Sequence, residues 1–513
     1  MDDIFSWSGY VSQRWVMAVM GMMGVMIAYV MRACLGITLT QMVRPVVVVD
    51  ESLSSVLHEY CPMPQSSSNS HTESNRTEIT EDKFQNRFDW DEKTQGEILS
   101  SFYYGYILTH LPGGVLSQRF GGKHTMGFGI LFTAVFTLMT PYVAYMGTRP
   151  LTILRFFEGL GEGTMFPALC TLLAQWAPPK EKGKLSTLVF AGVQIGNIFS
   201  NFLSGLIIQY IPGGWPNVFY IFGITSLIWF GLWCMFVYDD PSSHPFISKV
   251  ERDYLKESIG SLERQKDLAP TPWMTILTSW PVWALIIVEA GHDWGAYTII
   301  TDLPKYMNDV LHFSISENGL LSSFPYIAQW VTSILVSILS DWLITKRIMS
   351  VTAVRKSFAI IGNVGPGIGV MCASFVGCDK MIATLCFTLG MALMGFCYPS
   401  IRVNSLDLSP NYAPTIMALV NGIGCLSGMA TPFIAGILTP NRTVLEWRLV
   451  FWIMMAVMTV SSVAYGMYGT GELQPWDNLQ QHYLKENEKS KRGLPMQERL
   501  SIIHSKSIDD GNS

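Results

Sequence analysis

The amino-acid sequence predicts an all-helical membrane protein with twelve transmembrane helices arranged as two sets of six. The chain is 49% hydrophobic and only 14% charged, whereas soluble proteins carry about a quarter charged residues. It also contains many apolar runs of the length, roughly 20 residues, that a helix needs to cross a hydrocarbon core of ~30 Å. A charged stretch in the middle of the chain separates these runs into the two sets.

Runs of this length and continuity indicate helices, because the strands of a membrane barrel are about 10 residues long and alternate in polarity. A hydrophilic loop, residues 44–93, follows the first span. The first run is too long for the core of a signal peptide and lacks a convincing cleavage site, so we expect it to be retained. The expected spans, in chain order, are 14–40, 95–117, 125–146, 151–177, 187–210, 217–238, 281–304, 317–339, 357–377, 381–405, 413–438 and 449–470.

The polar stretches set the expected domain boundaries. Residues 239–280 form a charged linker, which we expect to be cytoplasmic and to contain a short helix. The linker divides an N-terminal six-helix bundle, residues 1–238, from a C-terminal six-helix bundle, residues 281–470. The remaining tail, residues 471–513, has the polar composition of a disordered, cytoplasmic segment.

Lysine and arginine residues gather in alternate connections between the spans. Loops rich in these residues stay in the cytoplasm, so we expect both termini to be cytoplasmic. Two N-x-[ST] sequons, at Asn75 and Asn441, fall in loops that this topology places outside, where glycosylation can occur. The basic residues are Arg119 and Lys123 after the second span, Lys180, Lys182 and Lys184 after the fourth, and Lys346, Arg347, Arg355 and Lys356 after the eighth.

The composition also excludes several functions. The net charge is −5 and no basic stripe indicates nucleic-acid binding. The nine cysteines form no CxxC pair and no metal-ligand spacing, so we expect no cofactor beyond a coupling ion. No set of nucleophile and base stands out, which argues against an enzyme. The sequence leaves open whether Cys61 and Cys378, which fall in loops, are paired.

The segment LRFFEGLGEGTMFP, residues 154–167, places three ionisable groups in an apolar span. Arg155, Glu158 and Glu162 have the spacing i, i+3, i+7, which is one face of a helix. A lone charge at mid-bilayer costs about 2.5–3.5 kcal/mol, so we expect these groups to face partners or a watery cavity. One arginine cannot neutralise two glutamates, and a surplus glutamate at low dielectric tends to bind a proton, as ion coupling requires. The alternative is a purely structural salt bridge between Arg155 and Glu158. Three glycines on the same helix permit close approach of a neighbour: Gly159, Gly161 and Gly163.

Arg32 lies deep in the first span, in AYVMRACLGITLTQM, with no evident partner nearby in sequence. Its distance from both ends of the span disfavours an arginine that reaches to the membrane surface. A guanidinium group can bond two oxygens of a carboxylate or phosphate at once. Arg32 and Arg155 are therefore candidate anion ligands in a central cavity.

The seventh span carries a second polar cluster, VEAGHDWGAY, with Glu289, His292 and Asp293 within about one turn. A histidine can exchange a proton near neutral pH, so His292 is a candidate for contact with the anion or for proton relay. Asp293 is a candidate for binding the coupling ion, and satisfied structural polar groups are the alternative reading. Arg402, in the tenth span, is expected to serve a gate or a salt bridge near the cytoplasmic mouth.

A partial repeat links the two halves. GGVLSQRFGGKH (113–124) follows the second span, and SILSDWLITK (337–346) follows the eighth. Basic turns after the second helix of each half, in a chain of six plus six spans, resemble the major facilitator superfamily. The superfamily pattern is Gly-x-x-x-Asp-Arg-x-Gly. The first copy has Gln118 at the aspartate position and the second keeps Asp341, a candidate gating residue.

Within that superfamily the sequence resembles the anion/cation symporter family, which includes sodium–phosphate cotransporters, sialin and the vesicular glutamate transporters. The resemblance covers about residues 14–478, and the stretch GHDWGAYTIITDLPKYM is most similar to the putative inorganic phosphate cotransporter branch. The other segments that carry it are MRACLGI, SFYYGYILTHLPGG, LRFFEGLGEGTMFPALCTLLAQWAPPKEKGKLST, VNSLDLSPNYAPTIMALVNGIGCLSGMATPFIAG and GELQPWDN.

The resemblance implies roles for four residues. Arg32 matches the first-span arginine that serves anion recognition in relatives, and Arg155 matches the arginine that opens the R-x-x-x-G-x-x-EG stretch. Glu158 and Glu162 match the two glutamates associated with proton coupling in the sialin type.

Three departures argue against vesicular glutamate loading. Cys170 stands where sialin and the glutamate carriers have a histidine, which also weakens a proton mechanism that needs it. Leu99 stands where the glutamate carriers have a histidine. His292 occupies the position of their seventh-span arginine.

We therefore expect a secondary active transporter that moves inorganic phosphate or a small organic anion by alternating access, coupled to Na⁺ or H⁺. We expect it to act as a monomer in the plasma membrane, with an endolysosomal or vesicular membrane as the second possibility. The alternatives are a proton-coupled carrier of organic carboxylates of the sialin type and, from another class, a non-transporting membrane receptor or scaffold.

Overall fold

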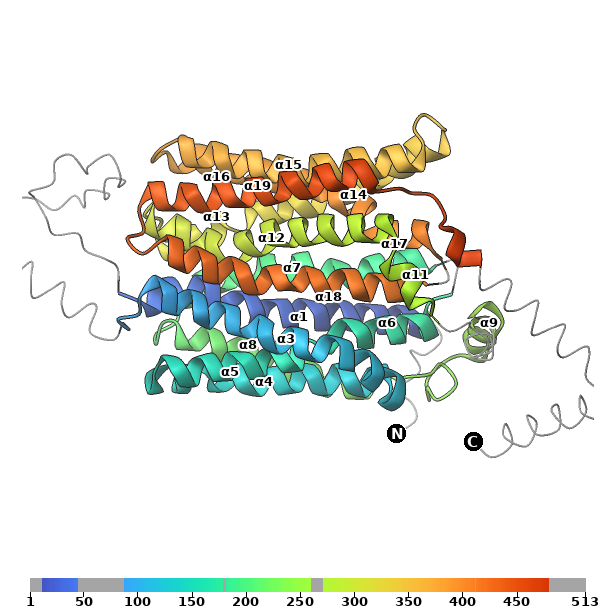
Figure 1. Cartoon of the computed structure of the whole chain (residues 1–513). Helices are drawn as coiled ribbons and strands as arrows, with labels where there is room; N and C mark the ends of the chain where they lie inside the picture. The colour runs from blue at the N-terminus through green and yellow to red at the C-terminus, as the bar shows by residue number, and fades with distance from the viewer. Residues whose placement is uncertain (1–11, 45–86, 179–180, 260–270, 411, 479–513) are drawn as a thin grey trace, which may run out of the picture.

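A computed structural model describes residues 12–44, 87–178, 181–259, 271–410 and 412–478 (Figure 1). The described chain is helical, apart from turns and one isolated bridge between Val43 and Phe88. Its long helices run side by side, as an all-α membrane protein requires. The predicted fold class is confirmed.

The first half contains six passes. They are α1 (Gln13–Met42), α3 (Glu92–Phe120), α4 (Gly122–Met146), α5 (Thr148–Glu162) continued by α6 (Met165–Trp176), α7 (Lys182–Tyr210) and α8 (Pro216–Phe236). The predicted linker helix is α9 (Lys249–Ile259), and a short helix, α11 (Trp273–Leu277), precedes the second half.

The second half also contains six passes. They are α12 (Trp280–Asp309), α13 (Ile315–Leu321) with α14 (Phe324–Thr345), α15 (Val351–Phe375), α16 (Lys380–Met394) continued through two turns into α17 (Val403–Leu408), α18 (Ala413–Leu438) and α19 (Val444–Tyr468). A last turn, Pro475–Asn478, ends the described chain. Each predicted span coincides with one of these passes.

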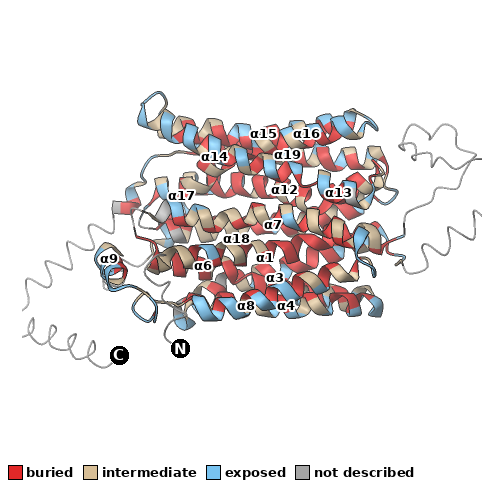
Figure 2. Ribbon diagram, turned by 180° about the vertical axis from the view of Figure 1, so that it is seen from behind, coloured by how far each residue is buried: buried red, intermediate tan, exposed pale blue. Residues whose placement is uncertain are grey.

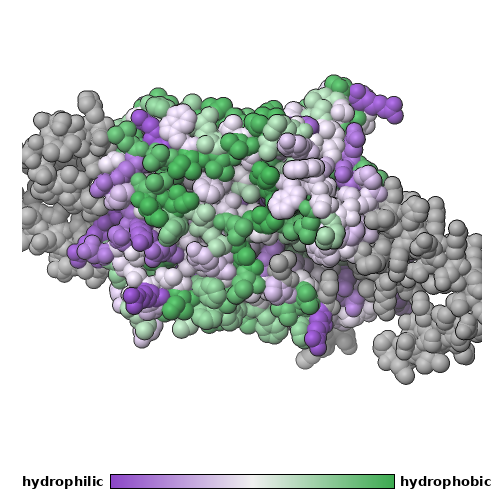
Figure 3. Space-filling model, viewed as in Figure 1, coloured by the Kyte–Doolittle hydropathy of each residue, from purple (hydrophilic) through white to green (hydrophobic). Residues whose placement is uncertain are grey.

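Nine of the described helices are long and apolar enough to cross a membrane by length and composition. The other passes are α3, α5–α6 and α12, which carry buried charges or a break. Large apolar side chains such as Leu108, Val115 and Ile338 are exposed on the outside, while buried residues line the interior (Figure 2). Hydrophilic residues gather toward the two ends of the long axis (Figure 3). A surface this apolar is suited to lipid rather than water.

The fourth and tenth passes are not the continuous helices that the sequence predicts. α5 ends at Glu162 and α6 begins at Met165, and in the tenth pass a 3₁₀ turn, Gly395–Cys397, and a π-helical turn, Tyr398–Arg402, follow α16. A proline has no N–H to donate to the carbonyl four residues earlier and crowds that carbonyl. The prolines responsible are Pro167 and Pro399, each four residues after a glycine.

α3 and α5 approach each other through glycines. A Cβ atom added at Gly105 would overlap the carbonyl oxygen of Phe156, and one at Gly159 would overlap that of Phe102. Small residues allow membrane helices to pack backbone to backbone. The expectation that Gly159 permits close approach is therefore confirmed.

We predict that Gly105→Ala lowers the stability of the protein by about 1–3 kcal/mol, the usual range for overpacking, because the neighbouring backbone cannot move aside cheaply. The control is Gly114→Ala on the same helix, where an added Cβ meets nothing within 4 Å. Melting curves of the detergent-solubilised variants test the prediction. Equal melting temperatures for the two variants would contradict it.

α1 begins and α19 ends at one end of the helix bundle, which we call the terminal end; the other is the opposite end (Figure 1). At the terminal end Gly121 has φ +88°, and Asp239 accepts a hydrogen bond from the Lys123 amide at 2.7 Å. The first copy of the repeated turn is thus fixed by a carboxylate from the end of α8. Asp341, near the end of α14, is exposed.

Most of the described cysteines lie inside the helices. Among the described residues Cys378 is disulfide-bonded, and the free cysteines lie within the passes. Cys61 and Asn75 lie outside the described residues, so the structure adds nothing on the pairing of Cys61 or on the first sequon.

Candidate functional site

Arg32, in the middle of α1, has its partner on α5. Its Nη2 atom lies 2.9 Å from Glu162 Oε1, and the two side chains are only 2% and 0% exposed. Breaking such a buried pair would leave an uncompensated charge at a cost of about 3–5 kcal/mol. The expectation of a surplus glutamate in the fourth span is wrong, because Arg32 supplies the second guanidinium group.

Arg155 binds Glu158, one turn along α5. Glu158 also accepts a hydrogen bond from the Thr140 hydroxyl on α4 at 3.0 Å. Arg155, Glu158 and Glu162 are all buried, as expected for one inward helix face. In this group Arg32 and Arg155 are therefore each paired with one glutamate.

Aromatic rings bring the two arginines together. The Phe102 ring centroid lies 4.9 Å from the guanidinium carbon of Arg32 and 5.0 Å from that of Arg155. Tyr106 and Tyr29 also lie against the Arg32 guanidinium, at 4.6 and 4.8 Å. A desolvated cation over an aromatic face gains roughly 2 kcal/mol. The rings therefore stabilise both guanidinium groups at one place inside the protein.

A small void borders both arginines. It measures about 10 Å³, enough for about one water molecule. Residues of the first half line it together with Ile300 and Thr301 from α12, so it lies where the two halves of the chain meet. In this conformation the expected watery chamber is nearly closed.

The second half has its own buried charges. Arg402 Nη1 lies 2.6 Å from Glu289 Oε1, and its Nη2 lies 3.4 Å from Asp293 Oδ1. Arg402 also donates to Asn421 Oδ1 at 2.9 Å. The Arg402 side chain is 35% exposed, whereas that of Glu289 is 1% exposed. The predicted gating arginine thus joins the predicted ion-coupling aspartate in one cluster.

His292 is not brought to the two arginines of the first half. It is buried, and its Nδ1 lies 3.3 Å from Asn363 Oδ1 on α15. The Cys397 thiol donates to the same amide oxygen at 3.3 Å. No contact of His292 with Arg32 or Arg155 is found among the described residues.

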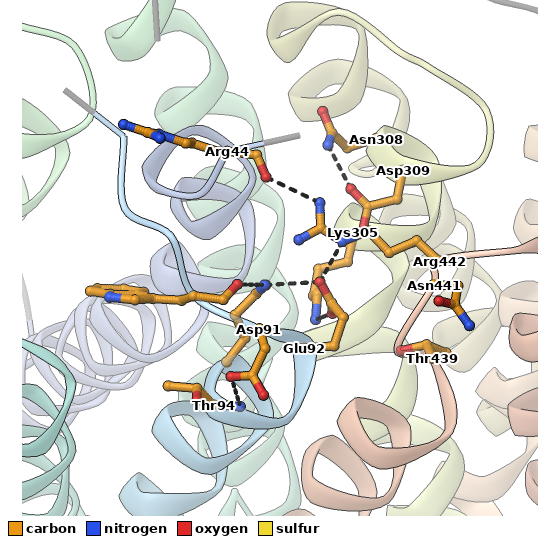
Figure 4. Close-up of polar contacts among 12 residues, drawn as sticks. Arg44, Asp91, Glu92, Thr94, Lys305, Asn308, Asp309, Thr439, Asn441 and Arg442 are labelled. Atoms are coloured by element: carbon orange, nitrogen blue, oxygen red, sulfur yellow. Dashed lines mark hydrogen bonds and ion pairs between the residues drawn. The ribbon is translucent and has the colours of Figure 1, made fainter. Parts of the chain in front are cut away.

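A third group of charges at the opposite end joins the two halves (Figure 4). Glu92, at the start of α3, lies 2.5 Å from Lys305 Nζ and 2.6 Å from Arg442 Nε. Arg442 also lies 3.9 Å from Asp309 and donates to the Arg44 carbonyl at 3.5 Å. We call Glu92, Lys305, Asp309 and Arg442 the outer cluster. Sequence reasoning missed it because each charge lies near the edge of an expected span, where charged side chains are ordinarily solvated.

The other hydrogen bonds found between the two halves of the described chain lie deeper. Gln194 donates to the Tyr398 hydroxyl at 2.5 Å, and Ser323 donates to the Ile198 carbonyl at 3.3 Å. Polar contacts therefore join the two halves from the middle of the helix bundle to its opposite end.

Comparison with known proteins shows the family of the chain. Residues 21–432 match the model of the Major Facilitator Superfamily. Human sialin is 39% identical over 466 residues, which cover 91% of both chains. The chain belongs to the anion/cation symporter family of that superfamily. The symporter is thus an ion-coupled anion transporter that works by alternating access, and not an enzyme.

Other relatives of the symporter are similar over most of their length. A putative inorganic phosphate cotransporter of Drosophila ananassae is 40% identical and covers 78% of this chain and 83% of its own. Vesicular glutamate transporter 1 of Xenopus laevis is 33% identical and covers 90% of this chain and 76% of its own.

Solved structures show the fold alone. The xylose transporter XylE of E. coli, in an inward open conformation, is 14% identical with a TM-score of 0.64, covering 89% of the symporter and 96% of XylE. A bacterial homolog of the human lysosomal transporter Spinster is 12% identical with a TM-score of 0.62, covering 88% and 96%.

The structure also places Leu99 and Cys170, two of the residues that the resemblance marks as expected departures. Leu99 lines the void beside Arg32 and Arg155, so an apolar side chain borders the candidate anion site. Cys170 is exposed on α6. A separate surface groove of about 530 Å³ lies between α3, α5 and α18 and does not include the arginines.

Proposed function

We propose that the symporter carries inorganic phosphate or a small organic anion, and that the anion binds between Arg32 and Arg155. One observation carries this proposal. Both guanidinium groups lie against the Phe102 ring, and both border one void between the two halves. Two guanidinium forks offer paired N–H donors to the oxygens of a carboxylate or phosphate.

The glutamates give this site a way to couple anion binding to a proton. An anion that binds Arg32 competes with Glu162, which lies 2.9 Å from the same guanidinium. A buried carboxylate that has lost its counter-ion is stabilised by taking up a proton. Glu162, and in the same way Glu158 beside Arg155, would then carry a proton with the anion.

The basic connections between passes support an assignment of the two ends. Lys and Arg residues in the connections after the second and eighth passes lie at the terminal end, and basic connections favour the cytoplasm. With the terminal end in the cytoplasm, the outer cluster joins the two halves of the symporter on its outer side. Asn441 is exposed at the opposite end, as a glycosylated asparagine must be. Its glycosylation stays a prediction.

The second candidate is a proton-coupled carrier of organic carboxylates of the sialin type. The similarity of human sialin over 91% of this chain favours it. Two observations disfavour a glutamate site that depends on charged groups at these positions. Leu99 lies beside the arginines, and His292 is bonded to Asn363. Neither observation distinguishes the two candidates. The membrane of residence also stays a proposal, with the plasma membrane first and an endolysosomal or vesicular membrane second.

Uptake by proteoliposomes tests the function. Purified protein is reconstituted, and labelled phosphate or N-acetylneuraminic acid is offered under a sodium gradient or a pH gradient set separately. We expect uptake of one anion under one gradient, and none by liposomes without protein. A lack of gradient-driven uptake of both anions would favour the receptor or scaffold and overturn the proposed substrates.

The outer cluster makes a separate prediction. Thr301→Cys places a thiol at the void, on the inner side of the cluster. We expect a membrane-impermeant maleimide, added at the opposite end, to label this thiol at least about ten times faster when Lys305→Ala is added. The reason is that loss of a buried ion pair costs about 3–5 kcal/mol, and each 1.4 kcal/mol changes a population tenfold. The control is Lys93→Ala, whose pairing with Glu97 is exposed. Equal labelling rates with Lys305→Ala and Lys93→Ala would show that the cluster does not hold this end closed.

A further inference from the structure

We propose that the second half of the symporter holds one monovalent cation, Na⁺ or H⁺, between Glu289 and Asp293 beside Arg402. The site itself stands on charge and geometry, and only its part in coupling rests on the proposed function.

The charge balance differs between the two halves. In the first half Arg32 and Arg155 each have one glutamate. In the second half Arg402 is shared by two carboxylates, and no other cationic side chain is found in an ion pair with either of them among the described residues. An uncompensated ionised carboxylate in the interior costs several kcal/mol. One more positive charge is therefore needed for the cluster to be neutral.

Glu289 shows where that charge is missing. Only 1% of its side chain is exposed, and its Oε2 atom has no hydrogen-bond partner in the described part of the chain. A carboxylate oxygen buried in this way is stabilised either by a proton or by a cation.

The available ligands are oxygens of the kind that hard cations prefer. Glu289 and Asp293 supply carboxylates, and the Asn421 carbonyl oxygen accepts a hydrogen bond from Arg402 Nη1, the nitrogen that also lies against Glu289. The absence of a side chain at Gly424 leaves space for the Asp293 carboxylate, because a Cβ atom added at Gly424 would overlap Asp293 Oδ2. The described residues contain no group of three or more His, Cys, Asp or Glu side chains suited to a metal ion. After Arg402 neutralises one of the two carboxylates, one negative charge remains, which a monovalent cation would neutralise.

Water can reach the site from one direction. Arg402 is 35% exposed while its carboxylate partners are buried, and the bonds between the two halves lie from mid-depth to the opposite end. A cation would therefore enter from the terminal end in this conformation. The other titratable or charged groups that act on the two carboxylates or on Arg402 are Arg32 and Tyr29 on α1, His292 and Tyr297 on α12, Cys397 and Tyr398 in the tenth pass, and Cys425 on α18.

Melting curves of the purified full chain, without any transported anion, test the site. Wild-type protein is compared in NaCl and in N-methyl-D-glucamine chloride at pH 8, and in the latter salt at pH 5.5. We expect Na⁺ or acid to raise the melting temperature by about 1–2 °C, the effect on a chain of this length of a ligand several times above its dissociation constant. A response to Na⁺ assigns sodium, and a response to acid alone assigns a proton.

Two variants make the test specific. Glu289→Gln and Asp293→Asn each remove the surplus charge at nearly constant shape, so each is expected to melt no lower than cation-free wild type and to lose the cation response. Asp341→Asn, at an exposed carboxylate, is expected to keep it. The proposal is overturned if wild type responds to neither condition, or if both site variants respond as wild type does. Arg32→Lys separates the two proposals, because it should weaken anion binding and leave the cation response intact.

Discussion

Arg32→Lys is expected to lower anion uptake about 10- to 100-fold while the protein still folds. Lysine keeps the positive charge beside Glu162, so the buried carboxylate retains a partner. It loses the planar fork that binds two oxygens at once. One charge-assisted hydrogen bond is worth about 1.5–3 kcal/mol, which corresponds to this range of affinity.

The measurement is initial uptake rate in proteoliposomes, normalised to the amount of monodisperse protein. Arg149→Lys is the matched control, because Arg149 is exposed at the opposite end. Arg32→Ala is expected to lower the yield of folded protein as well as uptake, because it leaves Glu162 buried without its partner. Normal uptake by Arg32→Lys would remove Arg32 from the anion site.

Arg402→Met is expected to be among the most destabilising single changes in the chain. It leaves Glu289 and Asp293 buried beside each other without the arginine that pairs with both of them, at a cost of about 3–5 kcal/mol or more. Two buried carboxylates at close range also repel each other. We expect a large loss of monodisperse protein after solubilisation and a lower melting temperature.

A triple variant tests the cause of that loss. Arg402→Met combined with Glu289→Gln and Asp293→Asn removes all three charges, and replacing a complete buried ionic group is often neutral for stability. We expect the triple variant to recover most of the folded protein. If Arg402→Met alone folds as well as wild type, the two carboxylates do not depend on Arg402.

The fold could be predicted because lipid imposes one requirement on every pass: a run of apolar residues long enough to cross the membrane. The edges of the passes were harder to place. α3 begins at Glu92, before the predicted residue 95, where the Asp91 side chain caps it by accepting a hydrogen bond from the Thr94 amide. Glu92 is buried there because Lys305 and Arg442 from the other half neutralise its charge. The break after Glu162 had a local signal in Pro167, since the carbonyl four residues before a proline loses its partner.

The sequence predicted which residues form the candidate site, but it did not predict which of them pair with each other. Local spacing offered a salt bridge between Arg155 and Glu158 only as the alternative reading, and the structure pairs these two residues. The pairing of Arg32 with Glu162 joins two helices far apart in the chain, and no local pattern encodes it. For the same reason the surplus carboxylate was expected on α5, whereas the structure has two carboxylates for one arginine in the cluster of Glu289, Asp293 and Arg402.

Equilibrium binding tests the anion site most directly, because it needs no gradient and no conformational cycle. The labelled anion selected by the uptake experiment is titrated onto purified wild type, Arg32→Lys and Arg155→Lys. If both guanidinium groups hold the anion, each variant binds it at least about tenfold more weakly. Wild-type affinity in both variants would show that the anion is bound elsewhere in the symporter.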